Sequence, residues 1–156
     1  MKNSIGLNKD KITNLTDNLN DLLANYQLYY QNLRGFHWNI KGSDFFTLHE
    51  KFEELYNAAQ LSIDEIAERI VTLEAVPLHT YSDYVAKSDI EEHKNVSTSD
   101  GTVSNVIGDL SLLIEKERET LEIAADLGDE STVDMMTELI SFQEKTLWML
   151  NSFNHK

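Results

Sequence analysis

Apolar side chains recur at helical spacing over four long stretches of this chain. In the first stretch the apolar positions are alternately four and three residues apart, which is typical of one face of an amphipathic helix. These positions are Leu15, Leu19, Leu22, Tyr26, Tyr29, Leu33 and Phe36. The pattern predicts a helix from Asn8, a suitable N-cap residue, to about Asn39, with Gly42 able to adopt a left-handed conformation after it.

Three further stretches with similar periodicity predict three more helices. The second helix is capped by Ser43 or Asp44 and ends before Pro77, which cannot continue a helix. The third and fourth helices cover about 102–127 and 131–153. Their apolar positions would form one common core.

The connection between the second and third helices, residues 77–100, is polar and long for a helical bundle. Its segment 80–88 is expected to form one or two helical turns. No strand alternation or internal repeat is present in the sequence. A long connection at this point is typical of a ferritin-like bundle rather than a simple up-and-down bundle. We therefore predict an all-α fold, a ferritin-like four-helix bundle with a short extra helix between helices two and three.

Length and composition narrow the classes of protein that fit this pattern. The 156 residues are enough for one domain, 1–156, with residues 1–7 as a short flexible N-terminal tail. The absence of cysteine excludes disulfides and thiolate metal sites. No stretch resembles a signal peptide or a membrane span, so we expect a cytoplasmic protein without membrane contact.

The formal net charge of −14 is unfavourable for binding nucleic acid and favours the attraction of cations. Lys2, Lys9 and Lys11 make the beginning of the chain slightly basic. We expect these lysines to be a solvated helix start rather than a tether for DNA.

Four side chains of metal-ligating type share one stripe of the second helix. At about 100° per residue, Glu53, Asp64 and Glu68 lie about 40°, 60° and 100° round from His49. Each of them alone would be explained as solvated surface charge, but the common stripe predicts a metal site. Mixed imidazole and carboxylate ligands suit Fe, Mn or Zn better than Ca or Mg.

A single helix cannot bring these ligands to one ion, because Glu53 and Asp64 are separated by roughly 16 Å of helical rise. They meet only if the helix packs antiparallel against a copy of itself, with His49 and Glu53 of one subunit facing Asp64 and Glu68 of the other. No histidine has a glutamate three residues before it, so the usual di-iron motif within one bundle is not available. The spacing predicts sites shared between two subunits.

His37 lies in an apolar setting between Phe36 and Trp38, where an imidazole needs a partner. It is either a metal ligand or a core histidine bonded to a backbone carbonyl. Three other residues of ligand type lie in the long connection and are expected to be solvated, namely Glu91, Glu92 and His93.

Together these residues resemble the signature of the Dps family, the mini-ferritins. That signature runs from a His-Trp-Asn turn into a Leu-His-Glu helix and on to Asp-x-x-x-Glu-Arg. The matching segments here are His37-Trp38-Asn39, Leu48-His49-Glu50 and Asp64-Glu65-Ile66-Ala67-Glu68-Arg69. The resemblance covers essentially the whole chain, and the family spacing between the motifs is kept.

The resemblance implies a hollow shell of twelve subunits, with di-iron ferroxidase centres at its two-fold interfaces. His37 and His49 would come from one subunit, and Glu53, Asp64 and Glu68 from its neighbour. Iron(II) would be oxidised there, preferentially by hydrogen peroxide, and iron(III) mineral would collect inside the shell. The consequence would be protection against oxidative damage. Zn or Mn are possible substitutes for Fe.

The resemblance also suggests roles for residues outside the centre. Trp38 resembles a family tryptophan that accepts an oxidising equivalent, although simple packing is the alternative. Acidic residues around the last inter-helix turn would form a pore that draws iron(II) inward, or would only favour the start of the fourth helix. These residues are Asp126, Asp129, Glu130 and Asp134.

Two functions other than iron oxidation are alternatives for this sequence. Many family members bind DNA through a terminal extension rich in Lys and Arg, and the short tail here argues against DNA binding. One alternative is a non-enzymatic shell that binds divalent cations. The other is a nucleoid-associated DNA-binding protein that acts through Lys2, Lys9 and Lys11.

Overall fold

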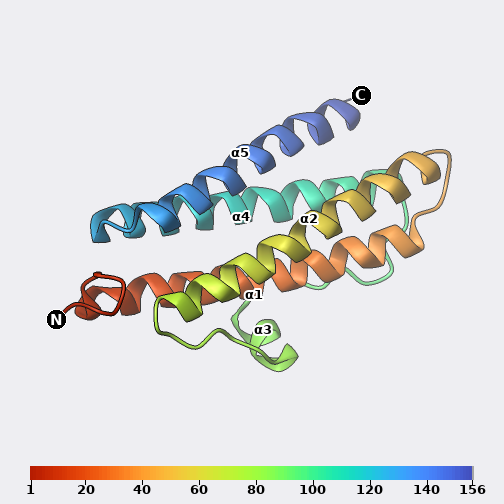
Figure 1. Cartoon of the computed structure of the whole chain (residues 1–156). Coiled ribbons are helices and arrows are strands. Elements are labelled where there is room, and N and C mark those ends of the chain that lie inside the picture. Colours follow the sequence, from red (N-terminus) through yellow and green to blue (C-terminus); the bar gives the residue numbers. More distant parts are fainter. Residues whose placement is uncertain (156) are drawn as a thin grey trace.

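The structure is a computed structural model that describes residues 1–155, and it contains four long helices and one short helix (Figure 1). No β-strand occurs in this part of the chain. The helices are α1 (Lys9–Asn39), α2 (Phe45–Thr72), α3 (Tyr81–Lys87), α4 (Ser99–Leu127) and α5 (Glu130–Phe153). The predicted all-α fold and the short helix between the second and third long helices are both confirmed.

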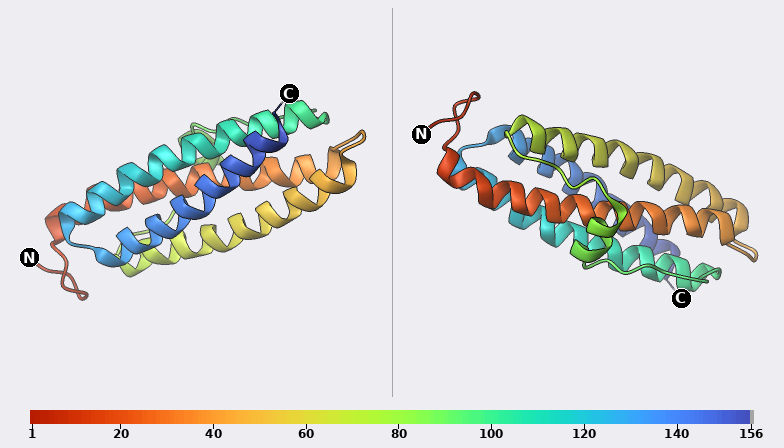
Figure 2. Two further views of the ribbon diagram at one scale, coloured as in Figure 1. Left: turned by 90° about the horizontal axis from the view of Figure 1, so that it is seen from above. Right: turned by 90° about the horizontal axis from the view of Figure 1, so that it is seen from below.

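The four long helices run side by side as a bundle (Figure 2). α1 packs against α2 and against α4, and α4 packs against α5, while the short α3 lies on the outer side of α1. Every predicted apolar position of α1 is buried. The core therefore sits along α1, and the α1–α2 turn lies at one end of the bundle.

The helix boundaries follow capping residues. The Asn8 side chain accepts a hydrogen bond of 3.0 Å from the Asp10 amide at the start of α1. Asp44 precedes α2 but makes no capping hydrogen bond through its side chain. α4 begins three residues before the predicted position, because Thr98 accepts a hydrogen bond from the Gly101 amide. Gly128 ends α4 with a φ of +75°, a conformation that glycine adopts without strain.

Two buried asparagines of α1 hold the long connection against the bundle. The Asn25 side-chain oxygen accepts hydrogen bonds from the amides of Asp89 and Ile90, both at 3.0 Å. The Asn32 side chain donates to the Glu91 carbonyl and accepts from the His93 amide. These bonds satisfy backbone groups that a loop without secondary structure would otherwise leave unpaired.

Residues 1–7, the predicted flexible tail, form a hydrogen-bonded loop that reaches the end of α2. The Ser4 amide donates a 2.9 Å hydrogen bond to the Glu74 carboxylate, and Lys9 pairs with the same carboxylate at 3.4 Å. The amino-acid composition of this segment did not predict these contacts with Glu74. None of the described helices combines the length and the apolar character that crossing a bilayer requires.

Candidate metal centre

The end of α1 and the beginning of α2 bring His37 and His49 together through a reciprocal pair of hydrogen bonds. Nδ1 of His37 lies 2.6 Å from the carbonyl oxygen of His49, and Nδ1 of His49 lies 2.7 Å from the carbonyl oxygen of His37. The two rings are stacked, with centroids 3.8 Å apart and planes 12° from parallel. The short α1–α2 turn thus positions both imidazoles as one unit.

The reciprocal bonds decide which nitrogen of each histidine is free. A carbonyl oxygen can only accept a hydrogen bond, so each Nδ1 carries the proton. In the neutral ring the lone pair is then on Nε2, which is available as a metal ligand. In the sequence analysis, a hydrogen bond from His37 to a backbone carbonyl was the alternative to metal binding. In the structure this hydrogen bond orients His37 for metal binding.

Aromatic rings fix the two imidazoles in place. Phe45 stacks on His49 with centroids 4.9 Å apart, and Tyr56 meets His37 edge-on at 5.3 Å. His37 is buried in the single chain, with 8% of its surface exposed. These contacts limit ring rotation and partly shield the nitrogen ligands from water.

The carboxylates of the predicted stripe do not complete a metal-binding cluster with the two histidines. Glu53, Asp64 and Glu68 are all exposed on α2. None of them takes part in an ion pair within residues 1–155. α2 is one continuous helix, so Glu53 and Asp64 are separated by roughly 16 Å of helical rise, as expected from the sequence. In the described part of the chain, no three residues of the His, Cys, Asp and Glu types come close enough together to hold a metal ion.

Trp38 is next to His37 in the sequence, but its ring makes no aromatic contact with the His37 ring. Its side chain is 57% exposed, and the Arg34 guanidinium lies 4.8 Å from its ring centroid. Among the described aromatic pairs, none joins Trp38 to either histidine. Its predicted role as an electron donor stays a prediction.

Comparison with known proteins identifies the family. The model of the ferritin-like domain matches residues 16–156. The DNA protection during starvation protein of Porphyromonas gingivalis is 41% identical over 151 residues, which cover 97% of this chain and 95% of that protein. The crystal structure of the Dps protein from Vibrio cholerae O1 superposes with a TM-score of 0.96 at 45% identity, covering 97% of this chain and 96% of that one. The chain belongs to the Dps family of ferritin-like proteins.

A Staphylococcus aureus Dps structure is also similar, with a TM-score of 0.90 at 31% identity, covering 97% of this chain and 99% of that one. The Vibrio protein is described as a member of a broad superfamily of ferritin-like diiron-carboxylate proteins. At the level of the Dps family, iron sequestration and DNA protection are therefore supported, and iron is the implied metal.

One of the predicted pore residues of this Dps-family chain has a different role. Asp129 is buried, with 3% of its surface exposed, and its carboxylate lies 2.5 Å from the Arg69 guanidinium. It also caps α5 through the Thr132 amide. Burial alone would raise the pKa of Asp129, but hydrogen bonds from Arg69 and Thr132 outweigh burial and hold the pKa below its ordinary value. Asp129 therefore joins α2 to α5 and does not offer free charge to a pore.

Replacing Asp129 with Asn is expected to lower the free energy of unfolding by about 2 kcal/mol, because the charge that Arg69 pairs with is lost. Urea denaturation followed by circular dichroism measures this change. The matched control is Glu130→Gln, since Glu130 is exposed at the next position and its replacement should change stability by less than about 0.5 kcal/mol. Equal stability of the two variants would contradict this role for Asp129.

The prediction that His93 is a solvated loop residue is wrong, because the side chain packs against the bundle. Its Nε2 lies 3.2 Å from the Asp109 carboxylate, and its ring stacks on Phe36 with centroids 5.9 Å apart. Burial raises the pKa of Asp109, and the hydrogen bond with His93 opposes this rise. Together with the Asn32 bonds, this pair fastens the long connection beside the histidine end of α1.

A polar cluster that the sequence pattern did not predict lies inside the bundle. The Tyr26 hydroxyl donates a 2.5 Å hydrogen bond to the Glu117 carboxylate, and the Gln143 amide donates to the same carboxylate oxygen at 2.8 Å and to the Tyr26 hydroxyl. Glu117 is fully buried, and burial raises its pKa to about 7. The sequence feature that could have indicated this cluster is that Glu117 and Gln143 occupy positions of the apolar repeat.

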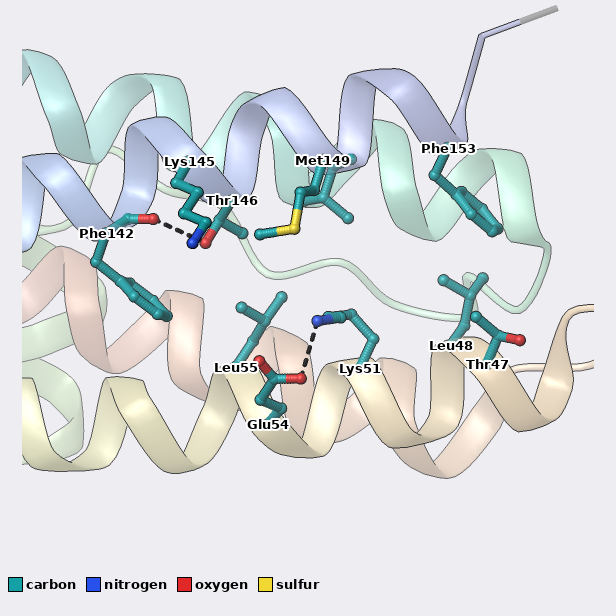
Figure 3. A pocket seen from close by; sticks show the side chains of 11 residues that line it. Thr47, Leu48, Lys51, Glu54, Leu55, Phe142, Lys145, Thr146, Met149 and Phe153 are labelled. Atoms are coloured by element: carbon teal, nitrogen blue, oxygen red, sulfur yellow. Dashed lines mark hydrogen bonds and ion pairs between the residues drawn. The ribbon is translucent and has the colours of Figure 1, made fainter.

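The bundle also has an apolar groove between α2 and α5, which Figure 3 shows from close by. Its volume is about 340 Å³, and Leu55, Phe142 and Met149 are among its lining residues. The groove contains neither histidine and none of the three stripe carboxylates. It is therefore separate from the candidate centre.

Proposed function

We propose that this protein is a ferroxidase whose iron-oxidising centres are each completed by two copies of the chain. The observation that carries the proposal is the paired arrangement of His37 and His49, which leaves both Nε2 atoms available while their Nδ1 atoms are engaged. Two nitrogen ligands that are not part of a complete ligand cluster within residues 1–155 form half of a mixed ligand set.

The other half is the pair of exposed carboxylates, Asp64 and Glu68, of a second copy. Asp64 and Glu68 are an i,i+4 pair on α2, so their side chains can converge on one ion. Antiparallel packing of two α2 helices about a two-fold axis would place this pair opposite the histidines of the partner, twice per dimer. Glu53 would serve as an outer ligand. The absence of a complete ligand cluster within residues 1–155 supports this division.

This ligand set suits iron as a substrate that changes its oxidation state. The anionic oxygens of Asp64 and Glu68 would stabilise iron(III) more than iron(II), which favours oxidation. The imidazoles of His37 and His49 bind only when unprotonated, so iron binding would weaken at low pH. We propose hydrogen peroxide as the preferred oxidant and a twelve-subunit shell as the container of the iron(III) product. Zn or Mn could occupy the same ligands.

Charge supports the supply of iron and opposes contact with DNA. Asp126, Glu130 and Asp134 are exposed around the α4–α5 turn and would attract iron(II), while Asp129 is excluded by its ion pair. The net charge is −14, and Lys9 is already paired with Glu74. For this chain, DNA protection would follow from the removal of iron(II) and peroxide.

Mixing two inactive variants tests whether the centre is shared. One chain carries His37→Asn and His49→Asn, and the other carries Asp64→Asn and Glu68→Gln. When the two are co-expressed in equal amounts, about one quarter of shared centres receive intact histidines from one chain and intact carboxylates from the other. Iron(II) oxidation, followed by iron(III) absorbance, should recover to about a quarter of the wild-type rate.

Each variant alone should be inactive, and a mixture that remains inactive would show that one chain must supply the whole centre. A wild-type protein that binds iron(II) but does not oxidise it with peroxide or oxygen would instead identify a non-enzymatic cation-binding shell.

A further inference from the structure

A series of aromatic rings leads away from the paired histidines, and Tyr56 is its first member. The Tyr56 ring meets His37 edge-on, with centroids 5.3 Å apart and planes at 82°. The Tyr30 ring meets Tyr56 in turn, at 6.1 Å and 81°. In the described part of the chain, Tyr56 is the only tyrosine or tryptophan whose ring contacts a candidate iron ligand. Tyr56 is therefore placed to pass an electron toward iron through His37.

A positive charge distinguishes the other two rings from Tyr56. The Arg34 guanidinium lies 5.4 Å from the Tyr30 centroid and 4.8 Å from the Trp38 centroid. A fixed cation stabilises an electron-rich ring and opposes removal of an electron from it, because the oxidised ring loses that attraction. Among residues 1–155, no cation lies over the Tyr56 ring. Tyr56 should accordingly be easier to oxidise than Tyr30 or Trp38.

Neighbouring positions on a helix do not face each other, which explains why adjacency in sequence does not favour Trp38. Side chains at i and i+1 point about 100° apart. Trp38 is accordingly 57% exposed, whereas its neighbour His37 is buried. Tyr56 is half-buried and reaches His37 from a different helix, α2.

Building on the proposed ferroxidase function, we propose that Tyr56 is the electron donor when a centre holds a single iron(II). Hydrogen peroxide takes up two electrons and two protons and becomes two molecules of water. One electron comes from iron(II), which becomes iron(III). The other comes from the Tyr56 phenol, which also releases its proton and becomes a neutral tyrosyl radical. The second proton comes from solvent, and the oxidising equivalent stays on the protein.

Electron paramagnetic resonance of the assembled protein tests this proposal. Wild-type protein loaded anaerobically with one iron(II) per centre and frozen soon after peroxide addition should show a tyrosyl radical signal. Tyr56→Phe keeps the ring beside His37 but lacks the phenol, so its signal should fall to that of iron-free protein. Tyr84→Phe, which alters a tyrosine of α3, should keep the wild-type signal.

A second measurement locates the radical without any substitution. Wild-type protein is treated in the same way with a nitroso spin trap present, digested with trypsin and examined by mass spectrometry. Cleavage after Lys and Arg separates Tyr56 in peptide 52–69, Tyr30 in peptide 12–34 and Trp38 in peptide 35–41. The adduct is expected on Tyr56 in peptide 52–69.

The possible outcomes separate this inference from the function on which it rests. Adducts confined to peptide 35–41 or 12–34, or a radical signal that persists in Tyr56→Phe, would overturn the role of Tyr56. The same conclusion follows if two irons per centre are oxidised normally but one iron gives no radical. If no iron(III) forms even with two irons per centre, the ferroxidase proposal itself fails.

Discussion

Replacing Asp64 with Asn and Glu68 with Gln in the same chain should lower the rate of iron(II) oxidation by at least about 100-fold. Both side chains keep their size, so packing is retained while two anionic ligands are lost. Neutral amide oxygens would not stabilise the extra positive charge of iron(III). The initial rate of iron(III) absorbance after peroxide addition measures the effect, with iron(II) binding followed separately by anaerobic titration.

The matched control is the double variant Glu54→Gln and Glu65→Gln. It removes the same number of charges from exposed positions of the same helix, at angles outside the stripe. A general electrostatic attraction of iron would be reduced equally in both double variants, whereas a built site is lost only in the first. Equal rates for the two would therefore refute the assignment of Asp64 and Glu68 as ligands.

Replacing Glu117 with Gln should make the bundle more stable at alkaline pH and remove part of its pH dependence. Burial raises the pKa of Glu117 from 4.5 to about 7, so the folded chain holds this proton more tightly than the unfolded chain does. The resulting stability is fully present below about pH 4.5 and is lost as the pH rises through about 7. At higher pH the folded state must hold a buried anion.

Glutamine imitates the protonated acid and can still accept hydrogen bonds from Tyr26 and Gln143. Between about pH 5 and pH 8, its stability advantage over the wild-type chain should therefore grow by about 2 to 3 kcal/mol. Urea denaturation at several pH values gives this difference, and assembly effects shared by both proteins cancel in it. Glu115→Gln, at an exposed position of α4, is the control. A constant difference between Glu117→Gln and wild type would contradict burial of the proton.

Much of the bundle could be predicted because long helices repeat one short pattern. Alternating apolar spacings and the Asn8 cap placed α1 correctly at both ends. The start of α4 was placed three residues late, because the apolar repeat begins only after the first turn and the Thr98 cap was not recognised. Glu117 and Gln143 followed the apolar repeat, yet their mutual contact depends on how α4 and α5 pack, which periodicity does not specify.

The candidate centre was also predicted in part from the sequence. Helical geometry alone places His49, Glu53, Asp64 and Glu68 on one stripe, because the rotation per residue is constant. His93 and Asp129 were misjudged, because their partners, Asp109 and Arg69, belong to distant segments of the chain.

By itself, the sequence determined the four-helix pattern, the stripe of ligand types and the distance that separates Glu53 from Asp64, since all three follow from local helix geometry. Only the tertiary structure decided that His37 and His49 bond to each other's carbonyls and so leave both Nε2 atoms free. It also decided that Asp129 forms an ion pair with Arg69 and that the Tyr56 ring contacts the His37 ring. These relations depend on the relative position of two helices, and no periodicity within one helix contains that information.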